Sequence, residues 1–251
     1  MHYVIGDIHN DLKKLKQILK QINITRDDEL IVLGDVFDRG GETADPFGVY
    51  CALAGLQGKC SWIRGNHDDW LANYTYEYFN TPEKKRHKLA PYGYNSFELL
   101  RQCITEVDMR NIADLIKGLP LQKELELEGK KYLCFGGTES PDKEEREAGY
   151  NWWPQEMPSD EEYAACEANL EANGWQVDYV LTHDAPSRFL DFTSLAVGES
   201  NRLHLFLDKV LLKLTYEKWF FGCYHKDVAL STKSRCVFCD VIPMGERHAK
   251  R

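Results

Sequence analysis

Short apolar runs alternate with amphipathic stretches along the first part of the chain. The runs cover residues 3–5, 30–33 and 61–64, and each stops directly before a glycine. Their length and their β-branched and aromatic residues predict buried strands that end in turns. Between the first two runs, residues 11–20 carry apolar side chains at helical spacing, with Asp11 placed to cap the helix. This order of strand, helix and strand predicts neighbouring strands that run parallel.

The middle of the chain changes to a helical pattern. Residues 69–117 are predicted to form a helical cover whose apolar face consists of Phe97, Leu99, Leu100, Ile104, Val107, Ile112, Leu115 and Ile116. Two runs follow at 121–127 and 131–135, and Gly129 between them favours a β-hairpin. Residues 136–158 are polar and aromatic without a clear period, which is typical of a long functional loop.

The last part of the chain repeats the order of helix and strand. Helices are predicted near 159–173 and 200–214. Apolar runs lead from residue 177 to His183 and from residue 218 to His225, so each predicted strand is followed by a histidine.

The composition is that of a globular protein, with 251 residues of which 43% are hydrophobic and 28% are charged. We expect one domain over 1–251, because the sequence has no linker, repeat or low-complexity tract. No apolar stretch approaches the roughly 20 residues that span a bilayer. The first strand begins within three residues of the start, which leaves no room for a signal peptide. These features predict a cytoplasmic protein that contacts no membrane.

The eight cysteines are interpreted as reduced core thiols, because a chain of this size needs no disulfide framework. Cys236 and Cys239 have the spacing of a zinc knuckle, but no second pair accompanies them, so a core strand is favoured.

The formal net charge of −9 argues against general nucleic-acid binding. It does not exclude a phosphorylated substrate, because bound cations would reverse the sign of the charge locally. The basic segment 247–251 is interpreted as a solvated terminus.

Residues suited to metal binding follow the first three predicted strands. Residues 6–9 read Gly-Asp-Ile-His, residues 34–40 read Gly-Asp-Val-Phe-Asp-Arg-Gly, and residues 65–68 read Gly-Asn-His-Asp. Open parallel sheets place ligands at the carboxyl ends of their strands, so these loops are expected to meet in space. Their carboxylates, imidazoles and amide suit a hydrolytic centre with two metal ions.

With the later histidines, these motifs resemble in order those of the calcineurin-like metallophosphoesterases. The Gly34 to Gly40 motif is similar to that of serine/threonine protein phosphatases and diadenosine polyphosphate hydrolases, while the rest resembles small bacterial or phage members. The resemblance implies an α/β fold, a four-layer αββα sandwich of two mixed sheets flanked by helices. It also implies a dinuclear metal site at the sheet edge.

The resemblance further implies which residues hold the metals. Asp35 would bridge two ions, most simply manganese, iron or zinc. The first ion would be bound by Asp7, His9 and His225, and the second by Asn66 and His183. A hydroxide between the ions would be the nucleophile.

Among the remaining motif residues, His67 would be the general acid, with its ring held by Asp38. General acid catalysis is worth about 10²- to 10⁴-fold in rate. Arg39, Arg64 and Asn66 would contact the substrate phosphate. For both arginines the alternative is a salt bridge that stiffens the loops. The phosphate contact is favoured for Arg39, and the two interpretations are equal for Arg64.

Cys223 departs from the family pattern, which has a histidine ligand of the second metal at this position. Three explanations are open. The thiolate binds a softer metal, the second metal site is weakened, or the chain is a variant of low activity. A weakened or altered second site, with the first metal intact, is favoured here.

Other polar and aromatic residues have structural interpretations. Trp152 and Trp153 either stack on an aromatic substrate group or, as favoured here, anchor the long loop. Asp184 and Asp227 either orient a neighbouring imidazole or cap a turn. The histidines outside the motifs are interpreted as surface or structural residues, namely His2, His87, His204 and His248.

These inferences predict a metal-dependent phosphoesterase that hydrolyses a phosphomonoester or a phosphodiester through a metal-bridging hydroxide. The alternative is an impaired binding or regulatory protein with the same fold, in which Cys223 weakens the second metal site. The sequence leaves the substrate open among a phosphoprotein, a nucleotide, a dinucleoside polyphosphate and an RNA end.

Overall fold

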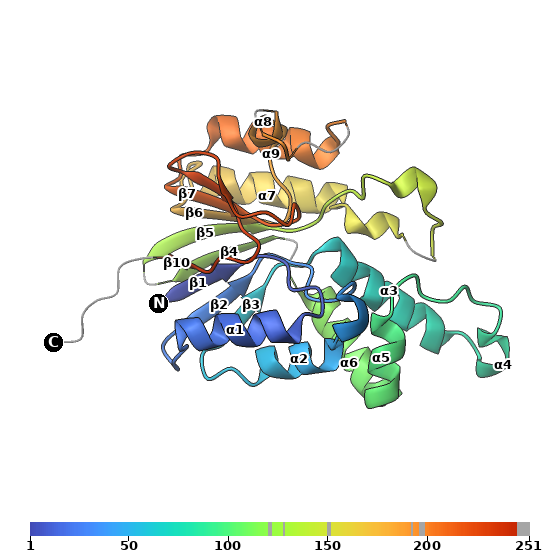
Figure 1. Ribbon diagram of the computed structural model, residues 1–251. Coiled ribbons are helices and arrows are strands. Elements are labelled where there is room, and N and C mark those ends of the chain that lie inside the picture. The colour runs from blue at the N-terminus through green and yellow to red at the C-terminus, as the bar shows by residue number, and fades with distance from the viewer. Residues whose placement is uncertain (120–121, 128, 150–151, 192, 196–198, 245–251) are drawn as a thin grey trace.

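Two mixed β-sheets lie face to face in this computed structural model, which describes residues 1–119, 122–127, 129–149, 152–191, 193–195 and 199–244 (Figure 1). In the first sheet, β1 (His2–Ile5), β2 (Glu29–Val32) and β3 (Lys59–Trp62) run parallel, as predicted. The strand β10 (Ile242–Met244) pairs antiparallel with β1 and completes the order β10-β1-β2-β3. The third strand begins and ends two residues earlier than expected.

The second sheet has the order β4-β5-β6-β7-β9-β8. The predicted hairpin is confirmed, because β4 (Gln122–Leu127) pairs antiparallel with β5 (Lys130–Phe135). Parallel pairing then runs from β5 through β6 (Tyr179–Thr182) and β7 (Lys218–Phe221) to β9, and β8 closes the edge antiparallel. The two remaining strands are β8 (Val228–Ala229) and β9 (Ser234–Cys236).

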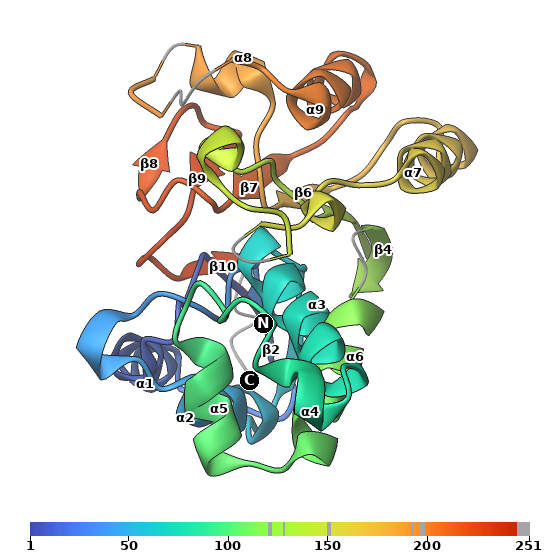
Figure 2. The ribbon, with the colours of Figure 1, turned by 90° about the vertical axis from the view of Figure 1, so that its right-hand side faces the viewer.

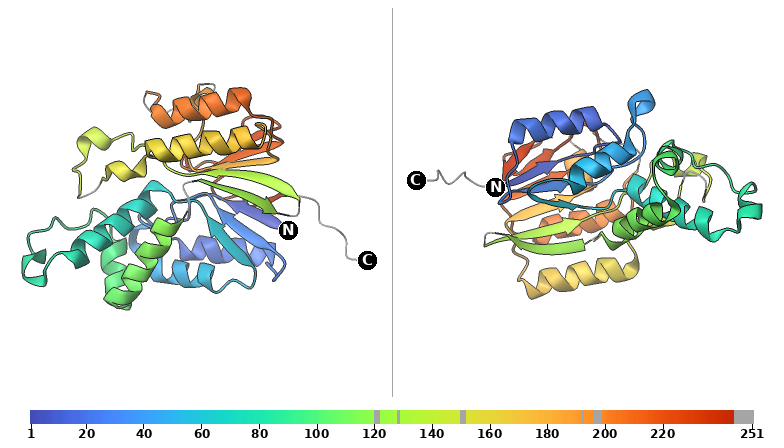
Figure 3. Two further views of the ribbon diagram at one scale, coloured as in Figure 1. Left: turned by 180° about the vertical axis from the view of Figure 1, so that it is seen from behind. Right: turned by 90° about the horizontal axis from the view of Figure 1, so that it is seen from below.

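Helices cover the outer face of each sheet, so the layering is αββα as predicted. The first sheet is covered by α1 (Leu12–Ile22) and α2 (Pro46–Ala54), and the second by α7 (Asp160–Ala172) and α9 (Arg202–Lys213) (Figure 3). The short α8 (Ser187–Leu190) contacts α9. The side chain of Asp11 accepts a hydrogen bond from the Lys14 amide, which confirms the predicted cap of α1.

The region predicted as a helical cover contains four helices beside the ends of the strands (Figure 2). These are α3 (Asn66–Asn80), α4 (Glu83–Arg86), α5 (Ser96–Cys103) and α6 (Glu106–Gly118). Most of the predicted apolar face is buried or half-buried, but Val107 and Leu115 are 65% and 43% exposed, so their assignment to that face was wrong. The long loop beside these helices contains two 3-10 turns, Lys143–Glu145 and Pro154–Glu156.

Successive side chains along the strands point to opposite faces of each sheet, and both faces are buried. In β1, Val4 faces the core between the sheets, whereas Tyr3 and Ile5 face the core beneath the helices. In β7, Phe220 faces the core between the sheets and Trp219 faces the helices. Strands covered on both faces require nearly continuous apolar sequence, which is the pattern seen in the chain.

The cysteines differ partly from the core interpretation. All eight are thiols rather than disulfides, but Cys51, Cys103 and Cys239 are exposed. Cys236 ends β9 and is fully buried, whereas Cys239 lies beyond the strand in a turn. The predicted strand across this pair is therefore too long.

Among the described helices, none combines the length and the apolar content that a bilayer span requires. Segment 247–251 and His248 lie outside the described residues.

Candidate metal centre and active site

The loops after five parallel strands meet at one edge of the two sheets, as the sequence predicted for the first three. The amides of Ile8 and His9 donate to the carbonyl of Asp35, both at 3.0 Å. The amide of Gly222 donates to the carbonyl of His183 at 3.1 Å, which joins the loops after β7 and β6. The predicted ligands therefore stand on loops that are fixed to one another.

Backbone strain is concentrated in these loops. Of the described non-glycine residues with positive φ, most belong to the predicted site or its neighbours: His9, Asn10, Asp35, Asp38, Arg39, Cys223 and His225, with φ between 47° and 66°. The left-handed conformation is unfavourable for such residues and persists where the surrounding structure holds it. This clustering is a sign of function that is independent of residue type.

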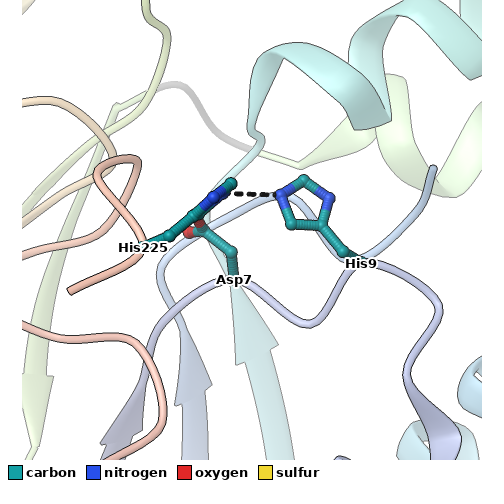
Figure 4. A group of neighbouring side chains, drawn as sticks. All are labelled: Asp7, His9 and His225. Atoms are coloured by element: carbon teal, nitrogen blue, oxygen red, sulfur yellow. Dashed lines mark hydrogen bonds and ion pairs between the residues drawn. The ribbon is translucent and has the colours of Figure 1, made fainter. Parts of the chain in front are cut away.

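Asp7, His9 and His225 form the first group of potential ligands (Figure 4). Their ligand atoms all lie within 4.8 Å of one another. The Nε2 atoms of His9 and His225 are 2.9 Å apart, and His225 Nε2 lies 3.1 Å from Asp7 Oδ2. The His9 Nδ1 is 3.1 Å from the carbonyl of Phe37, an arrangement that turns Nε2 toward the group. A carboxylate and two imidazoles fit manganese, iron or zinc.

Asp35 lies between this group and His183. Its Oδ2 is 3.8 Å from His9 Nε2 and 3.6 Å from His183 Nε2, while its Oδ1 accepts a hydrogen bond from the His67 amide. His183 is fully buried and its Nδ1 lies 2.7 Å from the Leu33 carbonyl. Its Nε2 has no hydrogen-bond partner among the described residues. A buried nitrogen with this orientation fits a metal ligand.

Glycine is required where the loop after β3 approaches Asp35. A Cβ atom at Gly65 would lie 2.1 Å from Asp35 Oδ1, closer than any real contact. At Gly34, φ is 110° and a Cβ would lie 2.5 Å from His183 Nδ1. The glycines of the motifs thus allow the predicted ligands to approach the neighbouring backbone.

His67 and Asp38 form a buried pair. The His67 Nδ1 is 3.3 Å from Asp38 Oδ2, which also accepts a hydrogen bond of 2.5 Å from the hydroxyl of Tyr92. Burial raises the pKa of Asp38 to about 7, although the hydrogen bonds from Tyr92 and Ser96 oppose this. Burial also lowers the pKa of His67.

Asp68 is a part of the site whose role the sequence did not reveal. It is fully buried, and its Oδ1 accepts hydrogen bonds from the amides of Val36 and Phe37 at 2.9 and 3.1 Å. Its Oδ2 accepts one from the amide of Gly65 at 3.2 Å. Asp68 therefore ties the loop after β2 to the loop after β3.

The two predicted phosphate-binding arginines have different surroundings. Arg64 is buried and pairs with Asp69 at 3.2 Å and with Glu162 at 3.9 Å, which favours the salt-bridge interpretation. Arg39 is exposed and lines a cavity.

This cavity has a volume of about 900 Å³ and is bordered by the predicted ligands Asp35, Asn66 and His225. Its other wall comes from the long loop and includes Arg146, which the sequence did not single out. The Arg146 guanidinium pairs with Asp142 at 2.6 Å and lies 4.9 Å from the ring of Trp70.

The sequence profile of the calcineurin-like phosphoesterases matches residues 3–218. The chain belongs to this family. Its members are metallophosphoesterases and generally use two metal ions.

Solved structures of other proteins resemble this family member over most of its length. Hypothetical protein PH1004 from Pyrococcus horikoshii OT3 is 13% identical, with a TM-score of 0.47, 94% of this chain covered and 76% of that one. A Saccharomyces cerevisiae serine/threonine phosphatase is 16% identical, with a TM-score of 0.47 and coverage of 94% and 66%. The phosphopantetheinyl hydrolase of Mycobacterium tuberculosis is 15% identical, with a TM-score of 0.47 and coverage of 94% and 89%.

Cys223, the residue expected to replace a family histidine, lies beside Asp7 and borders the cavity. Its amide donates to Asp7 Oδ1 at 3.2 Å, and its Sγ lies 3.7 Å from Thr138 Oγ1. Burial raises the pKa of the thiol to about 11, against the opposing effect of His183. The thiol is half-buried and lines the cavity.

Several polar residues near the candidate site have structural contacts. Asp184 binds His204 Nε2 at 3.1 Å and the Ala185 amide at 2.7 Å, so it combines an imidazole contact with a turn cap. Asp227 accepts hydrogen bonds from three successive backbone amides and is a turn cap. His2 pairs with Glu29 at 3.4 Å.

The aromatic pair in the long loop and the remaining histidine follow the structural interpretation. Trp153 is buried, with its ring 6.5 Å from that of Trp70, and Trp152 donates to Glu156 at 2.7 Å. These contacts support the role of loop anchors. His87 is exposed.

Proposed function

We propose that this chain is a metal-dependent phosphoesterase that hydrolyses a phosphomonoester or a phosphodiester. The observation that carries the proposal is the position of Asp35 Oδ2, 3.8 Å from His9 Nε2 and 3.6 Å from His183 Nε2. One carboxylate oxygen between two imidazole nitrogens is the arrangement that a bridging ligand of two cations requires.

The proposed ligands divide into two groups around Asp35. Asp7, His9 and His225 would hold the first ion, and Asn66, His183 and Cys223 the second. When bound, two such cations acidify a water molecule and so supply a nucleophile near neutral pH. The protein contributes a rigid set of ligands, because Asp35, His9 and His183 are anchored to backbone groups.

His67 is the proposed general acid for the departing alkoxide. It lines the cavity, and its other ring nitrogen faces Asp38, which fixes the orientation of the ring. The Tyr92 hydroxyl donates to Asp38 in turn, so two buried side chains fix the position of the imidazole.

Arg39 is the proposed phosphate clamp, with the Asn66 amide as a further phosphate contact. The Arg39 guanidinium reaches the cavity, and no ion pair of this group is found among the described residues. An arginine whose guanidinium is not used in an ion pair can make two charge-assisted hydrogen bonds to phosphoryl oxygens. Arg64 is left out of the clamp, since Asp69 and Glu162 already neutralise it.

The proposal is tested by elemental analysis of bound metal and by hydrolysis of p-nitrophenyl phosphate and bis-p-nitrophenyl phosphate. The protein is reconstituted with manganese, zinc or iron before the assay. We expect about two metals per chain and measurable turnover. The ester that reacts faster distinguishes a monoesterase from a diesterase.

A matched pair of histidine variants tests the catalytic assignment. His67→Asn should lower kcat by about 10²-fold or more without loss of metal, since it removes the proton donor. His87→Asn changes an exposed histidine outside the site and should have no effect. Absence of both metal and turnover under every reconstitution would overturn the proposal and favour the impaired protein.

A further inference from the structure

Two hydroxyl groups from the long loop contact Asn66 and Cys223, two of the ligands proposed for the second metal. Thr138 and Ser140 are 4% and 2% exposed. The backbone of their segment is held by hydrogen bonds from the Gly137 amide to the Arg64 carbonyl and from the Thr138 amide to the Glu156 carbonyl, both 3.3 Å. The segment is thus fixed against the loop after β3 and against the end of the long loop itself.

Ser140 belongs to a chain of hydrogen bonds that begins at Asn66. The Asn66 Nδ2 donates to Ser140 Oγ at 3.4 Å, and Ser140 Oγ donates to Glu156 Oε2 at 2.8 Å. Glu156 is buried, and its Oε1 accepts from the Ser140 amide at 2.8 Å and from Trp152 at 2.7 Å. Burial raises the pKa of Glu156 to about 7. In its ionised form the Glu156 carboxylate only accepts, so Ser140 Oγ donates to it and the amide nitrogen of Asn66 faces Ser140. The carbonyl oxygen of Asn66 is then left free for a cation.

Thr138 makes the corresponding contact with Cys223. Its Oγ1 lies 3.7 Å from Cys223 Sγ and donates to Asp184 Oδ2 at 2.6 Å. Asp184 is held in place by Tyr224 and by His204, at 2.5 and 3.1 Å. Since the proton of Thr138 Oγ1 goes to Asp184, this oxygen can only accept from the Cys223 thiol, and its fixed position limits where the sulfur can lie.

A third observation points to a ligand at this place. The Nε2 of the fully buried His183 lacks a hydrogen-bond partner among the described residues. It comes from the loop after β6, which the Gly222 amide ties to the loop that carries Cys223. The His183 Nε2 lies 3.6 Å from Asp35 Oδ2, and Asn66 and Cys223 border the same cavity as Asp35.

We propose that Thr138 and Ser140 are positioning residues that hold Cys223 and Asn66 as ligands of the second metal. The inference rests on the proposed function, because it assumes a metal at this position. Ser140 selects the amide oxygen of Asn66, and Thr138 limits the position of the sulfur. Loss of such outer contacts typically lowers metal affinity about 10- to 100-fold.

The test is a titration of the metal-free, full-length chain with cobalt(II) chloride, followed by calorimetry and by near-ultraviolet absorption. A thiolate bound to cobalt gives a charge-transfer band, which reports on Cys223 without reference to activity. Ser140→Ala should weaken the second cobalt about 10- to 100-fold and leave the first unchanged. Thr138→Val should weaken or shift the charge-transfer band, and Thr138→Ser, which keeps the hydroxyl, should restore it.

Two controls separate positioning from general damage. Ser61→Ala removes a serine hydroxyl that donates to the buried Glu29 at 2.7 Å away from the site, and it should leave both affinities unchanged. In an Asn66→Asp background, Ser140→Ala should no longer weaken the second cobalt, because either carboxylate oxygen can bind. Should Ser140→Ala not fold, Glu156→Gln takes its place, since its amide reverses the direction of the hydrogen bond.

The failure of this inference differs from the failure of the proposed function. If the wild-type chain binds two cobalt ions and the Ser140 and Thr138 variants bind both equally well, with an unchanged band, positioning is refuted and the phosphoesterase stands. Two bound ions without any charge-transfer band would refute the role of Cys223 as a ligand. If the wild-type chain binds no cobalt, the dinuclear site itself is refuted.

Discussion

Replacement of Asp68 by alanine should destabilise the protein more than the loss of an ordinary helix cap. The carboxylate accepts hydrogen bonds from the amides of Val36, Phe37 and Gly65 at 2.9 to 3.2 Å in a fully buried position. Asp68→Ala leaves three buried donors without a partner. Each such group costs about 1 to 3 kcal/mol.

Taking the lower end of that range, we expect Asp68→Ala to lower the free energy of unfolding by about 3 kcal/mol. For a protein of this size, 1 kcal/mol corresponds to about 2 to 4 °C in Tm, so the loss should be about 6 to 12 °C. The measurement is thermal and urea unfolding followed by circular dichroism. Metal binding should weaken as well, because the two loops that Asp68 joins carry Asp35 and Asn66.

The matched control is Asp45→Ala. Asp45 is half-buried and caps α2 through one hydrogen bond to the Gly48 amide at 2.7 Å. Its loss should cost about 1 kcal/mol. If Asp68→Ala lowers the stability no more than Asp45→Ala does, the argument from three buried amides is refuted.

Three further results are expected. Gly65→Ala places a Cβ 2.1 Å from the proposed bridging carboxylate. A misplacement of about 1 Å can lower the rate about 10²-fold, so kcat/KM for p-nitrophenyl phosphate should fall by about that factor. Gly118→Ala, whose Cβ would have no atom within 4 Å, is the neutral comparison. Burial raises the pKa of Glu29, but hydrogen bonds from His2 and Ser61 outweigh it and lower the pKa in the folded state. The ionised Glu29 therefore stabilises the folded protein above the unfolded-state pKa, and this contribution is lost as the pH falls through the folded-state pKa. The free energy of urea unfolding should decrease with falling pH in this range, and Glu29→Gln should reduce that dependence. Removal of metal with a chelator should lower Tm and added manganese or zinc should restore it; an unchanged Tm would contradict the proposed metal site.

Local sequence patterns were sufficient for most of the fold. The apolar runs and the glycines after them located β1, β2 and the loops that carry Asp7 and Asp35, because a strand covered on both faces needs continuous apolar sequence. The cap at Asp11 and the hairpin around Gly129 were equally local signals. Errors arose where burial depends on the neighbouring element, as for the exposed Val107 and Leu115.

The outer contacts of the site could not be predicted in this way. Glu156 meets Ser140 from 16 positions away, and Tyr92 meets Asp38 from 54 positions away. Neither residue has a spacing or a neighbour that marks it in the sequence. Such contacts are set by the way the long loop and α3 to α6 pack against the strand ends, which depends on the whole tertiary structure.

The first group of ligands joins opposite ends of the chain, since His9 and His225 are 216 positions apart. A cation held by both would act as a reversible cross-link across nearly the entire polypeptide. By the loop-entropy relation for disulfides, a cross-link that closes a loop of this length raises the free energy of the unfolded chain by about 5 kcal/mol. Metal supply would then govern how long the protein persists against unfolding, in addition to whether it can act.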